Sequence, residues 1–157
     1  MADLKNIRLV ALDVDGTLTD GGLIYGPDGI SQTFNSKDGA GIMALIEQGI
    51  QIAFVSFRDH ACTRRRAADL GVSLLCLGSS DKAASVTGLA EYLGIPLSAV
   101  LFMGDDTKDR PAMDICGLSA CPADADLEIR SVCDIVTSVN GGKGAVREVA
   151  RMILEEI

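Results

Sequence analysis

Two groups of carboxylates in this sequence each follow directly on a short apolar run. The first run, residues 7–12, ends at Asp13, and Asp15 follows two positions later. A run rich in Leu, Val and Ile is typical of a parallel strand that is buried on both faces. Ligands bind beyond the carboxyl ends of strands in open α/β sheets, so Asp13 is expected where such folds do chemistry. If extended backbone persists, Asp15 points the same way, because alternate residues of a strand share a face.

The second acidic group consists of Asp105, Asp106 and Asp109, and it follows the apolar run 100–103. Carboxylates at the ends of neighbouring parallel strands repel each other unless a cation lies between them. Mg²⁺ is a hard cation that takes oxygen ligands. The first group could instead be a calcium loop, but that loop needs a Glu at its twelfth position, where Ile24 stands. A capped turn without chemistry is the other alternative for the first group; the second group favours a magnesium site.

Two further residues could hold a phosphate group. Ser56 follows the apolar run 50–55 and offers a neutral hydroxyl donor, and Lys82 offers a positive charge at or just before a helix start. Either residue alone would be ordinary at the end of a loop. The stretch 141–144, Gly-Gly-Lys-Gly, lacks the glycine and the Ser or Thr of a P-loop, and we expect it to be the turn before the last helix.

The elements that must position these residues alternate between strand and helix. This alternation predicts an α/β fold with a doubly wound, Rossmann-like parallel sheet and right-handed crossovers. We expect a single domain over residues 1–157, with no cap domain. The expected strands are 7–12, 50–55, 72–77, 100–103, 118–121 and 135–136; the expected helices are 38–48, 60–70, 81–93, 111–116 and 146–156, with Asp38, Asp59 and Asp81 as candidate caps.

A β-hairpin is predicted over about residues 20–35, as an insertion after the first strand. Two β-prone pieces flank the turn sequence Pro27-Asp28-Gly29. The hairpin carries more apolar residues than a freely solvated flap would. We therefore expect it to pack either on the domain or against another subunit.

Composition excludes several classes of protein. The net charge of −8 argues against binding nucleic acid through its phosphates, which needs clustered basic residues. No apolar run approaches the roughly 20 residues of a membrane helix, and no secretory segment is expected at the N-terminus. The five cysteines form no Cys-x-x-Cys pair, so we expect reduced thiols in a cytoplasmic protein. A triad of the Ser-His-Asp type would depend on a single histidine without a nucleophile elbow.

Four motifs in this order resemble those of the haloacid dehalogenase superfamily of phosphohydrolases. The motifs are Asp13-Val14-Asp15-Gly16-Thr17, Ser56, Lys82 and Gly104-Asp105-Asp106-x-x-Asp109. Nearly the whole chain further resembles a capless group, the 3-deoxy-D-manno-octulosonate 8-phosphate phosphatases. That narrower resemblance is carried by the hairpin and by residues 19–22, 34–42 and 141–148. The nine-carbon keto-acid phosphate phosphatases and the tail of sialic acid cytidylyltransferases show the same pattern.

The resemblance implies a mechanism and a set of roles. Asp13 would attack phosphorus and form an aspartyl-phosphate, and Asp15 would act as general acid and then general base. Mg²⁺ would be held by Asp13, the Asp15 carbonyl and Asp105, with Asp106 or Asp109 in support. Ser56 and Lys82 would hold the phosphoryl group. Arg58 and Arg66 would lie near the substrate, a 3-deoxy-2-keto sugar acid phosphate; Arg58 favours the eight-carbon 8-phosphate over the nine-carbon 9-phosphate.

The resemblance also implies a homotetramer, built through the hairpin, and a place in lipopolysaccharide biosynthesis. One departure from the pattern lies beside the predicted phosphate site: the family usually has Thr-Gly-Arg where this chain has Ser56-Phe57-Arg58. Ser56 keeps the hydroxyl, whereas Phe57 adds bulk and removes the freedom of glycine.

Two alternatives come from other functional classes. A phospho-accepting receiver domain also combines a strand-end aspartate, an acidic pair with Mg²⁺, a hydroxyl residue and a lysine. In receivers, however, the acidic pair comes before the phosphoacceptor, and no second carboxylate follows it two residues later, as Asp15 follows Asp13. The other alternative is a catalytically silent interaction domain. Mg²⁺-dependent turnover of p-nitrophenyl phosphate would distinguish a phosphatase from both.

Overall fold

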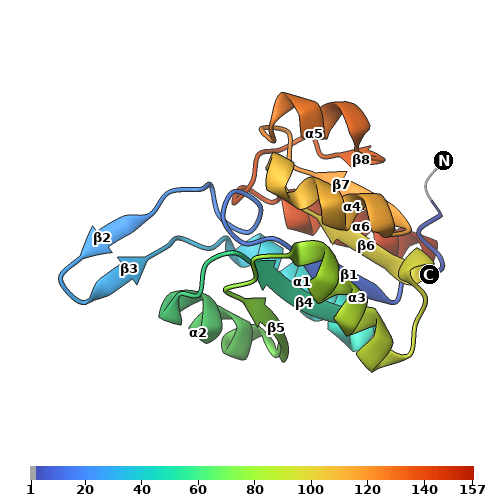
Figure 1. The fold of residues 1–157 in the computed structure, drawn as a ribbon, viewed down its shortest axis with the longest axis horizontal. Helices are drawn as coiled ribbons and strands as arrows, with labels where there is room; N and C mark the ends of the chain where they lie inside the picture. The colour runs from blue at the N-terminus through green and yellow to red at the C-terminus, as the bar shows by residue number, and fades with distance from the viewer. Residues whose placement is uncertain (1–2) are drawn as a thin grey trace.

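A six-stranded parallel sheet forms the centre of the molecule, as a computed structural model describes it over residues 3–157. All five strand pairs are parallel, and the strand order changes direction around the first strand of the chain (Figure 1). This is the doubly wound sheet that the sequence predicts. In spatial order the strands are β5 Leu74–Leu77, β4 Gln51–Ser56, β1 Leu9–Leu12, β6 Val100–Met103, β7 Leu118–Cys121 and β8 Ile135–Val136.

Helices cover both faces of this sheet. The helices are α1 Ser36–Glu47, α2 Ala61–Leu70, α3 Lys82–Leu93, α4 Arg110–Ile115, α5 Leu127–Val132 and α6 Ala145–Glu156, with 3₁₀ turns η1 Leu97–Ala99 and η2 Thr107–Asp109. One apolar cluster joins the sheet to α1, α2 and α6, and a second joins it to α3, α4 and α5. The structure thus has helix, sheet and helix layers, with a core on each side of the sheet.

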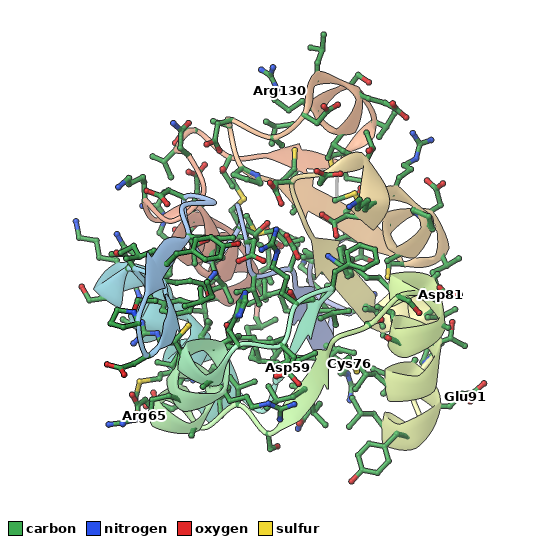
Figure 2. The ribbon with its side chains drawn as sticks, turned by 60° about the vertical axis from the view of Figure 1, so that its left-hand side comes forward. Asp59, Arg65, Cys76, Asp81, Glu91 and Arg130 are labelled. Atoms are coloured by element: carbon green, nitrogen blue, oxygen red, sulfur yellow. The ribbon has the colours of Figure 1, made fainter. Side chains whose placement is uncertain are left out.

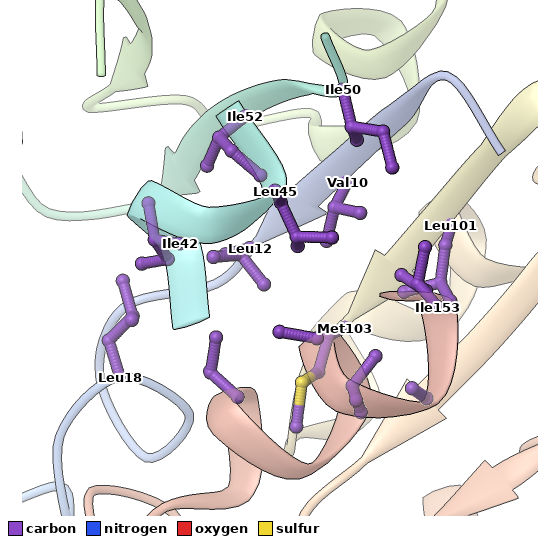
Figure 3. Packing of buried hydrophobic residues seen from close by; sticks show 14 of the residues in the cluster. Val10, Leu12, Leu18, Ile42, Leu45, Ile50, Ile52, Leu101, Met103 and Ile153 are labelled. Atoms are coloured by element: carbon purple, nitrogen blue, oxygen red, sulfur yellow. The ribbon is translucent and has the colours of Figure 1, made fainter. Parts of the chain in front are cut away.

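Alternate residues of the strands supply the two cores. In β1, Val10 and Leu12 face α1 and α6, whereas Leu9 and Ala11 face α3 and α4. Figure 3 shows the first of these clusters, in which Val10 and Leu12 lie beside Leu45 of α1. All four residues of β1 are buried, so this strand is fixed by packing on both faces and its end is a rigid place for a functional residue.

The predicted hairpin is present, and it stands away from the sheet (Figure 1). Its strands are β2 Ile24–Gly26 and β3 Gly29–Ser31, which pair antiparallel around the turn. Packing on the domain, one of the two alternatives for its apolar side chains, is found at Phe34, which packs against the first apolar cluster, but not at Ile24 and Tyr25. Ile24 and Tyr25 are 59% and 78% exposed.

Three details of the predicted elements were wrong. Asn35 rather than Asp38 caps α1, accepting hydrogen bonds from two N–H groups of its first turn. Asp59 does not cap α2; it forms an ion pair with Arg64 at 2.7 Å on the protein surface (Figure 2). Helix α5 was not expected at all. In contrast, Asp81 caps α3 through the N–H of Ala84, as predicted. Figure 2 labels Asp81 at the start of this helix.

Asp38 caps a different helix. Its Oδ1 accepts a hydrogen bond of 2.9 Å from the N–H of Arg147, in the first turn of α6. The N-cap residue of α6 is Gly144, which has no side chain to do this. A carboxylate from α1 therefore replaces the missing cap, and it joins two of the three helices that cover this face of the sheet.

No helix in residues 3–157 has the length and apolar character needed to cross a bilayer.

Candidate active site

The predicted catalytic and phosphate-binding residues meet at the carboxyl edge of the sheet. Asp13 follows β1, Ser56 ends β4, Lys82 begins α3 and Asp105 follows β6 by two residues. They line one small cavity of about 170 Å³. The complete lining consists of Asp13, Asp15, Ser56, Phe57, Arg58, Lys82, Asp105, Asp106, Lys108 and Asp109.

A larger hollow of about 880 Å³ opens at the opposite edge of the sheet, around residues that precede β1, β6 and β7. None of the predicted site residues lines it, and the two acidic groups lie at the other end of the strands. The small acidic cavity is therefore the candidate active site.

Lys82 is the buried cation of this cavity. Its Nζ donates hydrogen bonds of 2.6 Å to both Asp13 Oδ1 and Asp109 Oδ1, and its side chain is 4% exposed. Burial alone would lower the pKa of Lys82, but the two carboxylates raise it above its ordinary value. Lys82 therefore stays protonated and joins α3 to the ends of β1 and β6.

Asp13 and Asp105 carry more negative charge than Lys82 can balance. Burial raises the pKa of Asp13 well above its ordinary value, and the nearby Asp109 raises it further. Burial likewise raises the pKa of Asp105 to about 6, with contributions from Asp109 and Asp106. Two buried carboxylates in contact need a shared proton or a cation.

A divalent cation fits this arrangement. Oxygen atoms of Asp13, Asp105 and Asp109 all lie within 4.8 Å of one another. Carboxylate oxygens are the ligands that hard divalent cations prefer. Burial and the neighbouring carboxylates raise the pKa values of Asp13 and Asp105, and a cation bound between them would favour their ionised forms.

Asp109 is the least available of the three as a ligand. Its Oδ1 accepts from Lys82, and its Oδ2 accepts from the N–H groups of Asp105 and Asp106 at 3.0 and 3.1 Å. These bonds shape the loop that carries Asp105. Asp106 in turn accepts from the N–H of Lys108 at 3.0 Å, so that Asp106 and Asp109 close a capping box over η2.

Two glycines allow the acidic groups to come close. A Cβ atom on Gly16 would collide with the carboxylate of Asp105, and Gly16 also has a positive φ of 89°. A Cβ on Gly104 would collide with the carboxylate of Asp109. Gly16 thus leaves room for Asp105 of the other motif, and Gly104 leaves room for Asp109 of its own motif.

Asp15 lies at the mouth of the cavity and has two partners there. Its Oδ2 lies 3.6 Å from Arg58 Nε, and its Oδ1 accepts a hydrogen bond from Nε2 of Gln32. Gln32 directly follows β3 of the hairpin, and its Oε1 accepts from Thr63 Oγ1 at 3.0 Å and from Cys62 Sγ at 3.4 Å. The amide is therefore held from α2 and presents its NH₂ group to Asp15.

The remaining predicted residues divide into two cases. Ser56 is buried at the base of the cavity, where its Oγ accepts from the N–H of Arg58 at 3.2 Å. Arg66 does not line the cavity: its Nη2 donates to the carbonyl of Asn35 at 3.1 Å, and its guanidinium lies 5.7 Å from the ring centre of Phe34. A substrate role for Arg66 stays a prediction.

Sequence reasoning missed Gln32 and Lys108 as residues of this site. Neither belongs to an acidic motif, and Gln32 comes from the hairpin, far along the chain from Thr63. The apolar residues of the hairpin predicted only that it packs on the domain or on another subunit, and did not single out Gln32. The position of Lys108 between Asp106 and Asp109 in the sequence could have indicated that it belongs to the site.

The loop after β1 is supported by the turn before α6. The N–H of Gly142 donates to the carbonyl of Thr17 at 3.1 Å, and a Cβ on Gly141 would collide with the carbonyl of Gly16. Residues 141–144 form a turn, as predicted. Its glycines let this turn lie directly on the backbone next to Asp15.

A doubly wound sheet with paired aspartates after its first strand, a lysine and a second acidic group defines a haloacid dehalogenase-like hydrolase. The comparisons with known proteins agree. The family model for haloacid dehalogenase-like hydrolases matches residues 75–149. The 3-deoxy-D-manno-octulosonate 8-phosphate phosphatase KdsC of Haemophilus influenzae is 42% identical over 153 residues, which cover 97% of this chain and 85% of the relative.

Solved structures extend the likeness. The 3-deoxy-D-manno-octulosonate 8-phosphate phosphatase of Yersinia pestis superposes with a TM-score of 0.95 at 38% identity, covering 98% of this chain and 83% of that one. The enzyme from Moraxella catarrhalis, crystallised with a magnesium ion, a phosphate ion and a KDO molecule, gives 0.94 at 40% identity, with coverages of 98% and 88%. The chain belongs to the 3-deoxy-D-manno-octulosonate 8-phosphate phosphatase family, and it is a phosphatase.

Proposed function

We propose that this phosphatase is a magnesium-dependent phosphomonoesterase that hydrolyses 3-deoxy-D-manno-octulosonate 8-phosphate through an aspartyl-phosphate. The observation that carries this proposal is the cavity in which Asp13 and Asp15 lie with Lys82 and Asp105. Relatives that are about 40% identical over nearly the whole chain are 3-deoxy-D-manno-octulosonate 8-phosphate phosphatases, which supports this substrate. The 8-phosphate would enter the cavity, and the sugar acid would extend outward past Arg58.

Asp13 is the nucleophile in this proposal. A carboxylate oxygen of Asp13 attacks phosphorus, the bond to the sugar oxygen breaks, and Asp15 gives that oxygen its proton. Asp15 then takes a proton from a water molecule, which attacks the phosphorus of the aspartyl-phosphate and releases inorganic phosphate and the free Asp13 carboxylate. Ser56 and Lys82 donate hydrogen bonds to the phosphoryl oxygens throughout.

The cation proposed for the site is Mg²⁺, held by Asp13, Asp105 and the main-chain carbonyl of Asp15. When bound, it offsets the repulsion between the acidic cavity and an anionic substrate. We assign Asp106 and Asp109 to supporting roles, because the oxygens of Asp109 already accept three hydrogen bonds. The Mg²⁺ reported with the Moraxella relative supports this choice of metal.

The substrate assignment is tested with a panel of sugar phosphates ranked by kcat/KM. We expect the eight-carbon 8-phosphate to exceed the nine-carbon keto-acid 9-phosphates, and activity to disappear in EDTA and return with Mg²⁺. A higher kcat/KM for a nine-carbon substrate would establish that alternative instead. A receiver or silent domain would release no phosphate continuously from any member of the panel.

We also propose that the chain assembles as a homotetramer through its hairpin and works in the cytoplasm, in lipopolysaccharide biosynthesis. Exposed Ile24 and Tyr25 on a hairpin that stands away from the sheet support the assembly (Figure 1). Apolar side chains presented in this way are typical of a surface that a partner covers. A neighbouring subunit could then shield the site, over which residues 3–157 place no separate domain.

A further inference from the structure

Three cations line the acidic cavity, and they differ in what they already bind. Lys82 donates to two carboxylates at 2.6 Å, and Arg58 lies 3.6 Å from Asp15. Within residues 3–157, no carboxylate oxygen lies within 4.0 Å of Lys108 Nζ. Lys108 is thus the cation of the cavity lining whose charge is still available to an incoming anion.

The aromatic ring of Phe57 lies beside this charge. Lys108 Nζ is 5.3 Å from the centre of the Phe57 ring, and Lys82 Nζ is 5.0 Å from the same centre. Both distances fall within the range of cation–π attraction. Because the ring is 40% exposed, it forms part of the mouth of the cavity and not of the core.

The backbone of Lys108 is also fixed. Its N–H donates to Asp106 Oδ1 at 3.0 Å within the capping box of η2. The side chain of Lys108 can still rotate, and the electron-rich face of the Phe57 ring attracts its ammonium group. The ammonium group is therefore held at the cavity without neutralising any carboxylate.

We propose that Lys108, positioned by Phe57, is a binding residue for the phosphate group of the substrate. This inference rests on the proposed function, since it concerns how the same cavity captures a phosphate monoester. An anion approaching this cavity meets five lining carboxylates, and the chain carries a net charge of −8. A cation at the mouth offsets that repulsion before the phosphate reaches Lys82.

The test compares Lys108→Met, Lys108→Arg and Phe57→Leu with the wild type. For Lys108→Met we expect about a tenfold rise in KM for p-nitrophenyl phosphate and in Ki for inorganic phosphate, with kcat within about twofold. Lys108→Arg should keep KM and Ki close to their wild-type values, because the positive charge and the cation–π contact remain. Phe57→Leu keeps an apolar side chain but loses the ring, and should raise KM about threefold.

Salt dependence and a control variant sharpen the result. Lys108 is exposed, so raising the ionic strength should increase the wild-type KM more steeply than that of Lys108→Met. The control is Lys5→Met, which removes an exposed charge near the other edge of the sheet and should leave KM and Ki unchanged. Unchanged KM and Ki in Lys108→Met, or equal changes in Lys5→Met, would overturn the proposal.

Binding of inorganic phosphate by calorimetry, in the presence of Mg²⁺, separates this proposal from the choice of substrate. A weaker phosphate affinity in Lys108→Met supports the inference even if the sugar acid phosphate is a poor substrate. Equal phosphate affinity in the wild type and in Lys108→Met overturns the inference even if the sugar acid phosphate is the best substrate.

Discussion

The side-chain amide of Gln32 donates a hydrogen bond to the carboxylate of Asp15, and this contact joins the hairpin to the chemical site. The other end of the amide is held by Thr63 and Cys62 of α2. A residue proposed as the general acid is thus oriented from a segment outside the sheet. Arg58 contacts the second oxygen of Asp15 from the end of β4.

Gln32→Leu should lower kcat by about tenfold for alkyl phosphates, because Asp15 loses the partner that orients it toward the leaving oxygen. The loss should be smaller for p-nitrophenyl phosphate, whose leaving group needs less help from a proton donor. A purely structural role would lower both rates equally. Thr63→Val, which removes one of the two hydrogen bonds to Gln32 Oε1 and leaves the one from Cys62, serves as the control and should have a smaller effect on both substrates.

Asp13→Asn should retain less than about a thousandth of the activity, a loss of roughly 4 kcal/mol in transition-state stabilisation. An amide oxygen does not provide the nucleophile of the covalent route. The measurement is continuous phosphate release by purified protein, with circular dichroism to show that the variant is folded. Near-normal turnover by Asp13→Asn would remove the proposed mechanism.

Lys82→Met should destabilise the metal-free protein by about 3 kcal/mol, because it leaves Asp13 and Asp109 buried without their cation. Urea unfolding in EDTA measures this loss. Mg²⁺ should recover part of the stability, since it supplies positive charge to the same carboxylates. An unchanged unfolding free energy in EDTA would show that the buried ion pairs contribute little.

Asp38 provides a test of pH dependence away from the cavity. Burial raises its pKa, an effect that the N–H groups of Arg147, Gly144 and Val146 partly oppose. A carboxyl with a raised folded-state pKa stabilises the fold below its unfolded pKa, and this contribution is lost as the pH rises through the folded value. The stability of Asp38→Asn relative to the wild type should therefore increase as the pH rises above about 4, the ordinary pKa of an aspartate. Asp38→Ala, which also removes the acceptor for α6, should instead be less stable by about 1 kcal/mol.

Charged substitutions at the hairpin tip test the assembly. Ile24→Asp combined with Tyr25→Asp should shift the protein from tetramer toward monomer, because both side chains would otherwise be covered by a partner. Sedimentation velocity measures the shift, and Asp28→Asn at the turn is the matched control. A tetramer that persists in the double variant, or a wild type that is already monomeric, would contradict assembly through the hairpin.

The strands, the sheet and the convergence of Asp13 with Asp105 were predictable because buried runs and strand-end carboxylates are local patterns with fixed consequences. β6 was predicted with the bounds it has. The role of Asp38 at α6 was not predictable, because its partner lies 109 residues away and a local cap was equally compatible with the pattern. Gln32 and Lys108 were missed for the same reason: their contacts depend on how the hairpin, α2 and η2 are placed around the cavity. Helix α5 is short and has a single buried residue, Ile129, so it lacks a strong periodic pattern.

Gly141 and Gly142 contact the backbone at Gly16 and Thr17. A substitution more than a hundred residues along the sequence from Asp15 can therefore disturb the active site. One methyl group added at Gly141 would press on the peptide that leads from Asp15, so Gly141→Ala could impair catalysis while every acidic and basic residue of the cavity stayed unchanged. Such a variant would be expected to be harmless if only the catalytic and binding side chains were considered. Inactivating changes in this enzyme should therefore be sought among its smallest residues as well as its charged ones.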